Sequence, residues 1–249
     1  VILTAAAGGN YTGTAQKTFT IRPLPITVEA DPAQSVYNTE LAALSFRQTS
    51  GSTLEGEDLH FQAVTTVRKG YKAGVYSDAV SVSYDTANGD YAVTVKPADY
   101  TVTAATMSAA AEDYRGTYDG KAHSPSVTVK TGKFLTYATL YYSDTIMVDA
   151  SNYLKMSTTM PKFTDAGTHT VYYYAVCDSY EPVSGTVQAV ILPAALTVTA
   201  PDAQMSYGDN PQTAIAALTA GQLKYSGFVG GDTAESALTQ GENAVFATN

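Results

Sequence analysis

The octapeptide PLPITVEA at residues 23–30 decides the fold, because its pattern recurs twice further along the chain. It returns as PADYTVTA at residues 97–104 and as PAALTVTA at residues 193–200. The β-branched residues that follow each proline favour an extended strand. The proline itself lacks the N–H that a central sheet position needs, so it suits a boundary between elements. Three matches at one internal spacing indicate internal repeats.

A further run of alternating residues precedes each proline, at 18–21, 92–95 and 189–192. We therefore expect each proline to join the last strand of one module to the first strand of the next. The first and third junctions are the most alike, and they lie 170 residues apart. At that same separation Ala33, Gln34 and Tyr37 return as Ala203, Gln204 and Tyr207. The sequence thus predicts two alternating kinds of module.

Two weaker echoes support this alternation. Residues 56–58 (GED) resemble residues 230–232 (GGD), and Tyr11, Gly13 and Thr14 resemble Tyr180, Gly185 and Thr186. The predicted division has four parts: a closing hairpin of a preceding module (1–23), a complete module of one kind (24–97), a complete module of the other kind (98–193), and a truncated copy of the first kind (194–249). On this interpretation the sequence is a piece of a longer chain.

The composition favours a folded all-β protein. The chain has 249 residues, of which 45% are hydrophobic and 15% charged, so it can bury cores. Its 19 tyrosines, together with short Val and Thr runs, suit half-buried pleated surfaces. A net charge of −9 argues against nucleic acid and anionic lipid as partners. A single cysteine, Cys177, cannot form an intrachain disulfide, and we expect it to pack as an ordinary strand residue.

Module 98–193 reads as several strands separated by short turns. We expect residues 168–176 to pair with residues 185–192, and Tyr118-Asp119-Gly120 to form a turn before a strand at 126–129. This pattern fits an immunoglobulin-like sandwich.

Module 24–97 is less regular. Asn88-Gly89 predicts a type I′ hairpin between residues 78–84 and 91–96. Residues 41–70 could hold a short helix, so a β-grasp arrangement is as possible as a sandwich. The alanine-rich segment 107–113 is the other place for a helical turn. The predicted fold class is all-β, an elongated tandem array of immunoglobulin-like and β-grasp-like modules.

Several motifs resemble the repeat modules of bacterial surface adhesins and cell-wall-anchored proteins. Residues 9–14 with 18–21 resemble their closing hairpin, and residues 118–124 (YDGKAHS) and 164–168 (TDAGT) resemble turns of their immunoglobulin-like type. Residues 196–200 with Tyr207-Gly208-Asp209 resemble the β-grasp-like type often called MBG, although Asn38 and Thr39 replace the Gly-Asp pair in the earlier copy. The resemblance spans nearly the whole chain and implies a bacterial cell-surface or secreted, extracellular location.

No pattern of residues indicates a catalytic, cofactor-binding or metal site, and we predict that the chain is not an enzyme. His60, His123 and His169 are isolated from one another, so we do not expect zinc binding. For His123, in a predicted turn, and His169, in a predicted strand, we expect solvated or packed roles. Asp85, Asn88 and Asp90 are too few for calcium, and residues 228–232 lack the ending of a phosphate loop. No G-x-S-x-G nucleophile elbow occurs.

Tyrosines could serve a sugar-binding surface at residues 141–142 and 172–174, although the chain has no tryptophan. Because strand residues alternate between faces, about half of these rings must face a core, and we expect packing to be their main role. The ligand is left unassigned. Lysine–asparagine isopeptide bonds, which occur in surface proteins of this sort, could replace disulfides, but the sequence selects no pair.

The sequence therefore favours a structural stalk or adhesin repeat region that projects or links functional domains. The alternatives are a module that binds a carbohydrate or a host protein, and an accessory region of a secreted polysaccharide-active enzyme. The expected partners are neighbouring modules of the same chain, with host glycan, host protein or like chains in a fibre as further possibilities. No membrane insertion is expected, because no apolar run is long enough.

Overall fold

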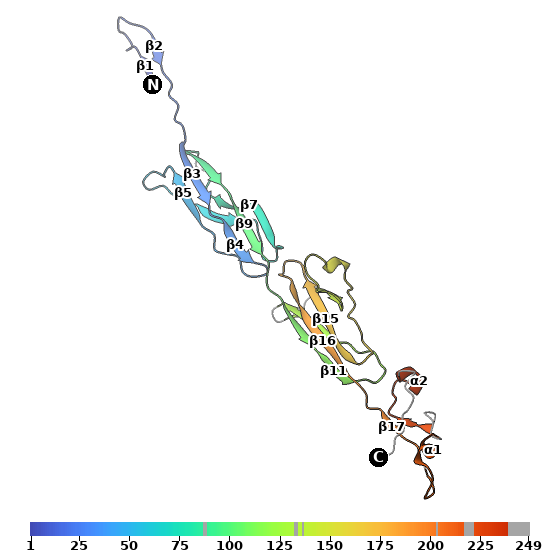
Figure 1. Ribbon diagram of the computed structural model, residues 1–249. Coiled ribbons are helices and arrows are strands. Elements are labelled where there is room, and N and C mark those ends of the chain that lie inside the picture. Colours follow the sequence, from blue (N-terminus) through green and yellow to red (C-terminus); the bar gives the residue numbers. More distant parts are fainter. Residues whose placement is uncertain (87–88, 132–133, 136, 203, 217–221, 239–249) are drawn as a thin grey trace. The chain divides into compact units, whose positions relative to one another are not determined.

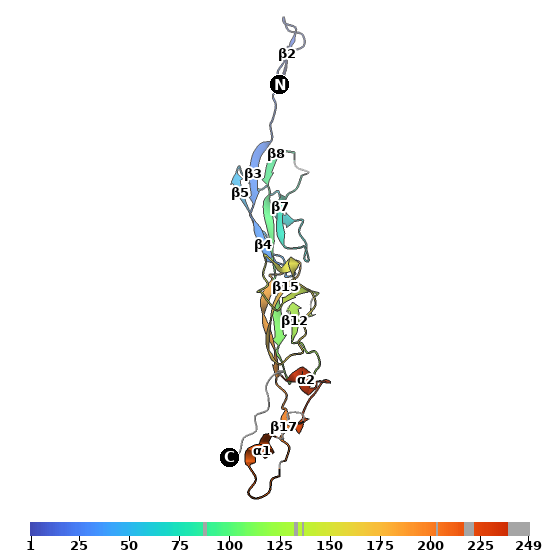
Figure 2. The same cartoon turned by 45° about the vertical axis from the view of Figure 1, so that its right-hand side comes forward.

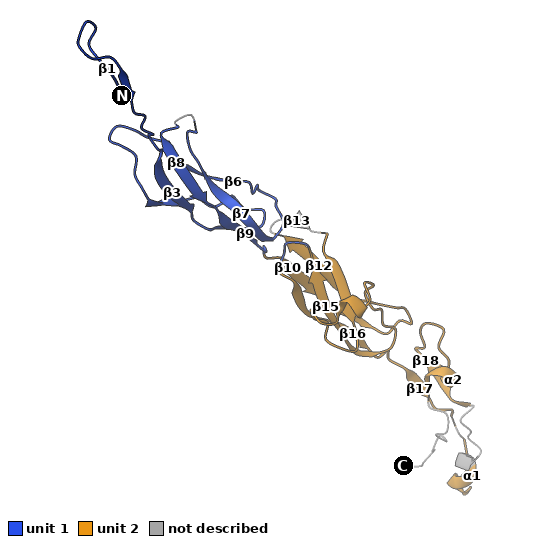
Figure 3. Cartoon of the chain, turned by 90° about the horizontal axis from the view of Figure 1, so that it is seen from above, with its two compact units in different colours: residues 1–105, 178–180 blue, residues 106–177, 181–249 orange. Residues whose placement is uncertain are grey.

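A computed structural model describes residues 1–86, 89–131, 134–135, 137–202, 204–216 and 222–238 of the chain. Two compact units make up the molecule, coloured separately in Figure 3. Unit 1 comprises residues 1–105 and 178–180, and unit 2 comprises residues 106–177 and 181–249. Strands dominate both units (Figure 1), and the helices described are the short ones at Tyr153–Lys155, Pro211–Ala216 (α1) and Ala234–Ala237 (α2). The predicted all-β, sandwich-type fold is confirmed.

Unit 1 contains a three-stranded and a four-stranded sheet, which Figure 2 shows from a second direction, and a two-stranded hairpin. The three-stranded sheet has the order β5 (Phe46–Ser50), β3 (Leu24–Ala30), β8 (Tyr91–Lys96). The four-stranded sheet has the order β4 (Ala33–Val36), β9 (Ala98–Thr103), β7 (Gly74–Ser83), β6 (Gln62–Thr65). In each sheet an early strand runs parallel to a late one, β3 beside β8 and β4 beside β9. A separate hairpin joins β1 (Ile2–Thr4) to β2 (Thr14–Gln16).

The core of unit 1 lies between these sheets. Alternation along β3 turns Ile26 and Val28 inward, where they are 1% and 0% exposed. They belong to one cluster with Val80 of β7 and Tyr100 of β9. The Tyr100 hydroxyl has a hydrogen-bond partner in this apolar core, because it accepts a hydrogen bond from the Ala42 N–H at 3.0 Å.

Three local predictions for this region are wrong. Strands β7 and β8 do not pair with each other but belong to different sheets, so the Asn88-Gly89 hairpin does not form there; Asn88 itself lies outside the described residues. Residues 41–70 contain β5 and β6 and no helix. Since a β-grasp fold packs a helix on its sheet, two facing sheets without a helix correct the β-grasp expectation for this module.

The strand after Pro97 also differs from its predicted place. The sequence predicts it as the first strand of the following module, yet β9 pairs with β7 and β4, and Tyr100 lies in the unit 1 core. The two compact units accordingly divide after Ala105 rather than after Pro97.

Unit 2 repeats the plan of two sheets. One has the order β10 (Ser108–Glu112), β12 (Ser126–Thr131), β13 (Phe134–Leu135). The other has the order β11 (Tyr114–Thr117), β16 (Val183–Leu192), β15 (Gly167–Val176), β14 (Thr139–Ser143). The predicted pairing of residues 168–176 with 185–192 is confirmed as β15–β16. A small two-stranded sheet joins β17 (Thr197–Thr199) to β18 (Lys224–Ser226).

The core of unit 2 joins its two sheets through Val127, Tyr142, Val171, Tyr173 and Val187. The predicted helical turn at 107–113 is wrong, because those residues form β10 and pair with β12. Pairing places Ala109 opposite Val129, and Ala109 packs against the core. Tertiary packing here overrides the helix preference of alanine. A further correction concerns residues 18–21, which form no strand, whereas 92–95 and 189–192 do.

Candidate functional site

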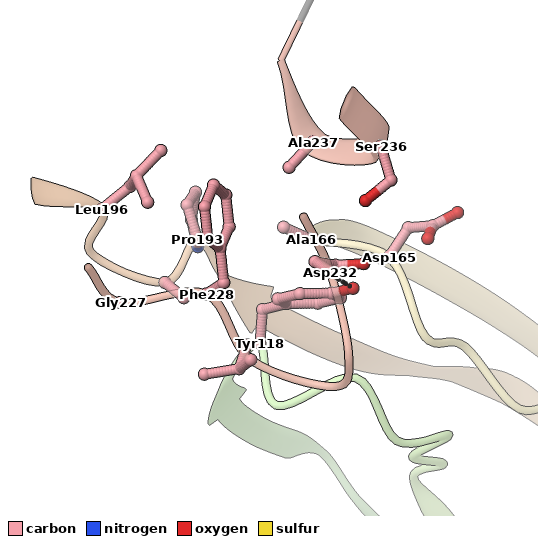
Figure 4. Close-up of a pocket in the computed structure, with 12 residues that line it drawn as sticks. Tyr118, Asp165, Ala166, Pro193, Leu196, Gly227, Phe228, Asp232, Ser236 and Ala237 are labelled. Atoms are coloured by element: carbon pink, nitrogen blue, oxygen red, sulfur yellow. Dashed lines mark hydrogen bonds between the residues drawn. The ribbon is translucent and has the colours of Figure 1, made fainter. Parts of the chain in front are cut away.

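A cleft of about 450 Å³ lies in unit 2, where the segment after Pro193 meets two turns of the preceding sandwich (Figure 4). Its wall combines apolar, hydroxyl and carboxylate side chains. The lining residues are Tyr118, Asp165, Ala166, Pro193, Ala194, Leu196, Gly227, Phe228, Val229, Asp232, Ser236 and Ala237.

One hydrogen bond spans this cleft. Tyr118 Oη, just after β11, donates to Asp232 Oδ2 at 2.7 Å (Figure 4). This bond raises the pKa of Tyr118, and burial and the negative charges of Asp232, Asp165 and Asp119 act in the same direction. The phenol therefore stays neutral over a wide pH range and is a donor rather than a base.

Two glycines allow the backbones to approach beside this bond. A Cβ on Gly120 would lie 2.3 Å from the Gly230 Cα, which leaves no room for a side chain. Both residues have positive φ, 73° and 65°. The YDG turn of residues 118–120 and the GGD turn of residues 230–232 thus fit together backbone to backbone.

A second cleft, of about 480 Å³, lies in unit 1 around Pro23. Its lining residues are Ile21, Arg22, Pro23, Leu24, Leu54, Glu57, Gly89, Asp90 and Tyr91. Tyr91 donates its hydroxyl to the Glu57 carboxylate and accepts the Leu54 N–H at 2.9 Å. The bond to Glu57 is the main cause that raises the pKa of Tyr91. A tyrosine–carboxylate pair therefore anchors the loop beside both clefts.

The two clefts are built on repeated elements. Strand β3 pairs with β5 as β17 pairs with β18, and Thr27 and Thr197, 170 residues apart, face Ser50 and Ser226. The glycine after each serine packs on the first strand. A Cβ on Gly51 would lie 2.2 Å from the Pro25 carbonyl oxygen, and one on Gly227 would lie 2.3 Å from that of Ala195.

Two turns repeat as well. The Glu57 N–H bonds to the Leu54 carbonyl as the Asp232 N–H bonds to that of Val229, both at 3.1 Å. The structural counterpart of Asp232 is therefore Glu57, one residue before the aspartate that the GED/GGD echo indicated. Asn38 and Gly208 also correspond, with φ of 63° and 95°. Asparagine tolerates this left-handed conformation, so replacing the Gly-Asp pair keeps the turn.

The unit 2 cleft combines a serine engaged in a helix cap, two carboxylates and an aromatic ring. Ser236 Oγ is engaged in the capping box that starts α2, where it bonds with Thr233. Asp165 and Asp232 give the cleft negative charge, and Phe228 supplies an apolar ring. This set could hold a hydroxylated or positively charged group and would repel an anion. Sequence reasoning identified the turns but missed the Tyr118–Asp232 and Tyr91–Glu57 pairs, because nothing local links these distant residues.

His123 and His169 take the packed roles predicted for them, and His60 is exposed. His123 stacks on Tyr114 at 4.4 Å and lies 2.9 Å from Asp119 Oδ1. His169 stacks on Phe163 at 4.4 Å. His60 is exposed and lies 2.9 Å from Asp85 Oδ2. Within the described ranges, no group of three or more His, Cys, Asp or Glu side chains could hold a metal ion.

The remaining candidates also have structural roles. Gly230 and Gly231 form the turn expected for residues 228–232. Tyr142, Tyr173 and Tyr174 are buried, so packing dominates the tyrosine runs as predicted. Tyr141 contacts Tyr153 edge to face, with ring centroids 5.0 Å apart, and both are half-buried. The expectation that Cys177 is a strand residue is wrong, because this half-buried cysteine lies just after the end of β15.

Comparison with known proteins gives no assignment. No family model matches the chain, and no curated protein matches it. Over the residues described, the structure contains no helix with the length and apolar character needed to span a membrane.

Proposed function

We propose that the chain is a non-enzymatic repeat region of a bacterial cell-surface or secreted protein, which spaces or links functional domains as a stalk. The location and the adhesin resemblance rest on the sequence motifs. The observation that carries the proposal is the recurrence of the β3–β5 strand pair as β17–β18, together with its packed glycine and its carboxylate-bearing turn.

Repetition of a junction, rather than of a reactive group, favours a structural role. Pro23 and Pro193 each precede a copy of the same strand pair, and each is part of a cleft closed by a tyrosine–carboxylate bond. An array of modules gains stability from each module and from each contact between neighbours. A repeated junction is what such an array requires.

Separate cores give the second line of support. The buried residues of unit 1 form one cluster, and a second cluster belongs to unit 2. Each unit consists of sheets that face each other, a plan that tandem extracellular modules use widely.

Small-angle scattering on the intact chain tests the stalk. A compact globule of this length has a radius of gyration of about 18 Å, and an unfolded chain about 55 Å. We expect an intermediate value, with a distance distribution that has a long tail. A radius near the compact value would contradict the stalk and favour modules packed around a shared cleft.

A binding module is the second candidate, and the unit 2 cleft is the observation that favours it. An aromatic ring beside hydroxyl and carboxylate groups is a composition that suits a saccharide, with Phe228 as the stacking surface. Titration calorimetry with oligosaccharides would test this, comparing the parent chain with Phe228→Ala and with Phe19→Ala, an exposed phenylalanine outside the cleft, as a control. If a sugar binds the parent chain and only Phe228→Ala abolishes that binding, the cleft is the binding site. If no sugar gives a heat signal, the binding proposal is wrong and the stalk remains as the proposed function.

A further inference from the structure

The hairpin β1–β2 resembles the hairpin β15–β16 in a short motif and in its pairing. Residues 13–16 read GTAQ and residues 185–188 read GTVQ, and both segments lead to a junction proline. The pairing agrees as well as the sequence. Thr14 faces Thr4 as Thr186 faces Tyr172, and Ala15 faces Leu3 as Val187 faces Val171.

Burial separates the two copies. In unit 2 Val171, Val187 and Ile191 are 0%, 2% and 1% exposed. Their counterparts are Leu3 and Ala15, from the pairing, and Ile21, which like Ile191 lies two residues before the proline. Leu3 is 68% and Ile21 is 82% exposed, and Ala15 is exposed too. The apolar face that forms a core in one copy faces solvent in the other.

The two hairpins differ in the number of residues between the GTxQ motif and the junction proline, but this difference keeps the apolar side chains on the same side of the strand. The first copy has two more residues than the second between the GTxQ motif and the proline. Because side chains alternate along a strand, an even insertion keeps Ala15, Phe19 and Ile21 on one side, with Lys17 between them. Phe19, at 76% exposed, then adds to the same uncovered face, where unit 2 has the fully buried Ala189.

Unit 2 identifies what covers such a face. Val171 and Val187 pack with Val127 of β12 and against Ala109 of β10, with Phe163 completing the cluster. The edge of β16 pairs in parallel with β11. An isolated two-stranded hairpin is marginal in water, and a contiguous apolar surface on it indicates an interaction site.

We infer that residues 1–22 are the closing strand pair of a β-sandwich of the unit 2 kind. The occupant of their apolar face is a sheet with the valine and alanine surface of β10–β12, beside an edge strand like β11. The inference rests on the proposed tandem-repeat function and specifies one of its contacts. It also explains why residues 18–21, although they alternate like a strand, form none: no neighbouring strand pairs with them in the described part of the chain.

The experiment keeps the full chain and adds the missing partner from its own sequence. A copy of residues 106–168 is joined directly before Val1, because the pairing makes Val1 the counterpart of His169. Hydrogen exchange of the amides of residues 2–4 and 14–21 is then compared between the extended and the parent chain. We expect exchange in the extended chain to slow on the order of 100-fold.

Two variants of the extended chain separate docking from general ordering. Ile21→Asp places a charge on the docking face and should abolish the protection. Gln16→Asp is the matched control, since its counterpart Gln188 is exposed in unit 2, and it should leave the protection intact. Unchanged exchange in the extended chain, including the case in which the copied segment stays unfolded, overturns the inference.

Self-association is the competing explanation. If the parent chain alone gains protection at residues 2–4 and 14–21 as its concentration rises, a second copy is the occupant and the proposed sandwich is wrong. Scattering from the parent chain tests the stalk independently of this hairpin, so either idea can fail while the other stands.

Discussion

Strands β3 and β17 carry the same repeat but lie in different surroundings. Val28 of β3 is fully buried, whereas its counterpart Val198, 170 residues later, is 49% exposed. Both strands have an antiparallel partner and a glycine packed on them. Among the residues that the structure describes, β3 faces a second sheet, which contributes Val80 and Tyr100 to its core, and β17 does not. The repeat therefore specifies a strand pair and its turn, and burial depends on strands supplied from elsewhere in the chain.

Removing the shared glycine should have the largest effect. Gly51→Ala places a methyl group against the Pro25 carbonyl oxygen and forces a left-handed conformation on alanine, so we expect unit 1 to lose about 3 kcal/mol of unfolding free energy. Gly227→Ala should disrupt the β17–β18 pair for the same reason. Gly56→Ala, where the added methyl meets open space, should cost only about 1 kcal/mol. Urea denaturation measures the loss of unfolding free energy, and hydrogen exchange of the amides in each strand pair shows where the loss lies. Equal losses for Gly51→Ala and Gly56→Ala would contradict the steric argument.

Truncating the corresponding valine in each copy tests whether the difference in burial produces a difference in stability. Val28→Ala leaves a cavity between the two sheets of unit 1, and we expect a loss of about 2 kcal/mol. Val198→Ala, the matched change in β17, should stay within about 0.5 kcal/mol. Both values come from urea titrations of the single variants. Equal losses would mean that β17 has a core that its exposure conceals.

The tyrosine–carboxylate pairs should respond to alkali. The pKa of Tyr91 is raised above 10.0, chiefly by its bond to Glu57, so this contribution to stability is present below pH 10 and is lost as the pH rises through the folded value. Tyr91→Phe should flatten this alkaline decline in unit 1, and Tyr118→Phe should do so for the β17–β18 region. Melting temperature between pH 8 and 11, estimated from the tyrosine range, is the measurement. An unchanged decline in both variants would show that other groups cause it.

An acid-sensitive ion cluster should have the smallest effect. Glu29 bonds to Lys96 at 2.6 Å and to Arg47 at 2.8 Å, and the residue 170 positions later is Thr199. The bond to Lys96 is the main cause that lowers the pKa of Glu29; burial opposes it, and Arg47 lowers the pKa further. The cluster therefore stabilises above pH 4.5 and weakens as the pH falls through the folded value. Glu29→Gln should slightly reduce the acid sensitivity of unit 1, and the same measurement on Thr199→Ala, which removes no charge, should show no change.

The sequence predicted strands well where a proline and a β-branched run mark them, as at β3, β9 and β15–β16. The predictions were wrong where the pairing of a strand depends on residues far away in the sequence. Residues 78–84 and 91–96 have the signature of a hairpin, yet β7 pairs with β6 and β9 while β8 pairs with β3. The alanines at 109–111 favour a helix locally, but a place beside β12 makes them a strand.

The candidate site was predictable only in part, for the same reason. The turns at 118–120 and 230–232 were visible as turns, because glycine and aspartate mark them locally. The bond between Tyr118 and Asp232 joins residues 114 positions apart and has no local signature. Glu57 was misaligned by one residue, since the GED and GGD triplets match in letters while the loops that carry them differ in length.

The parallel pairing inside each unit has a mechanical consequence. Strands β4 and β9 run in the same direction, as do β11 and β16, although one is early and the other late in its unit. Two ends of a unit pulled apart would therefore drag these neighbouring strands past each other. All the hydrogen bonds of the ladder then resist together in shear, whereas a hairpin pulled from its open end gives way one bond at a time. The parallel ladder in each sandwich therefore favours resistance to tension applied along the chain.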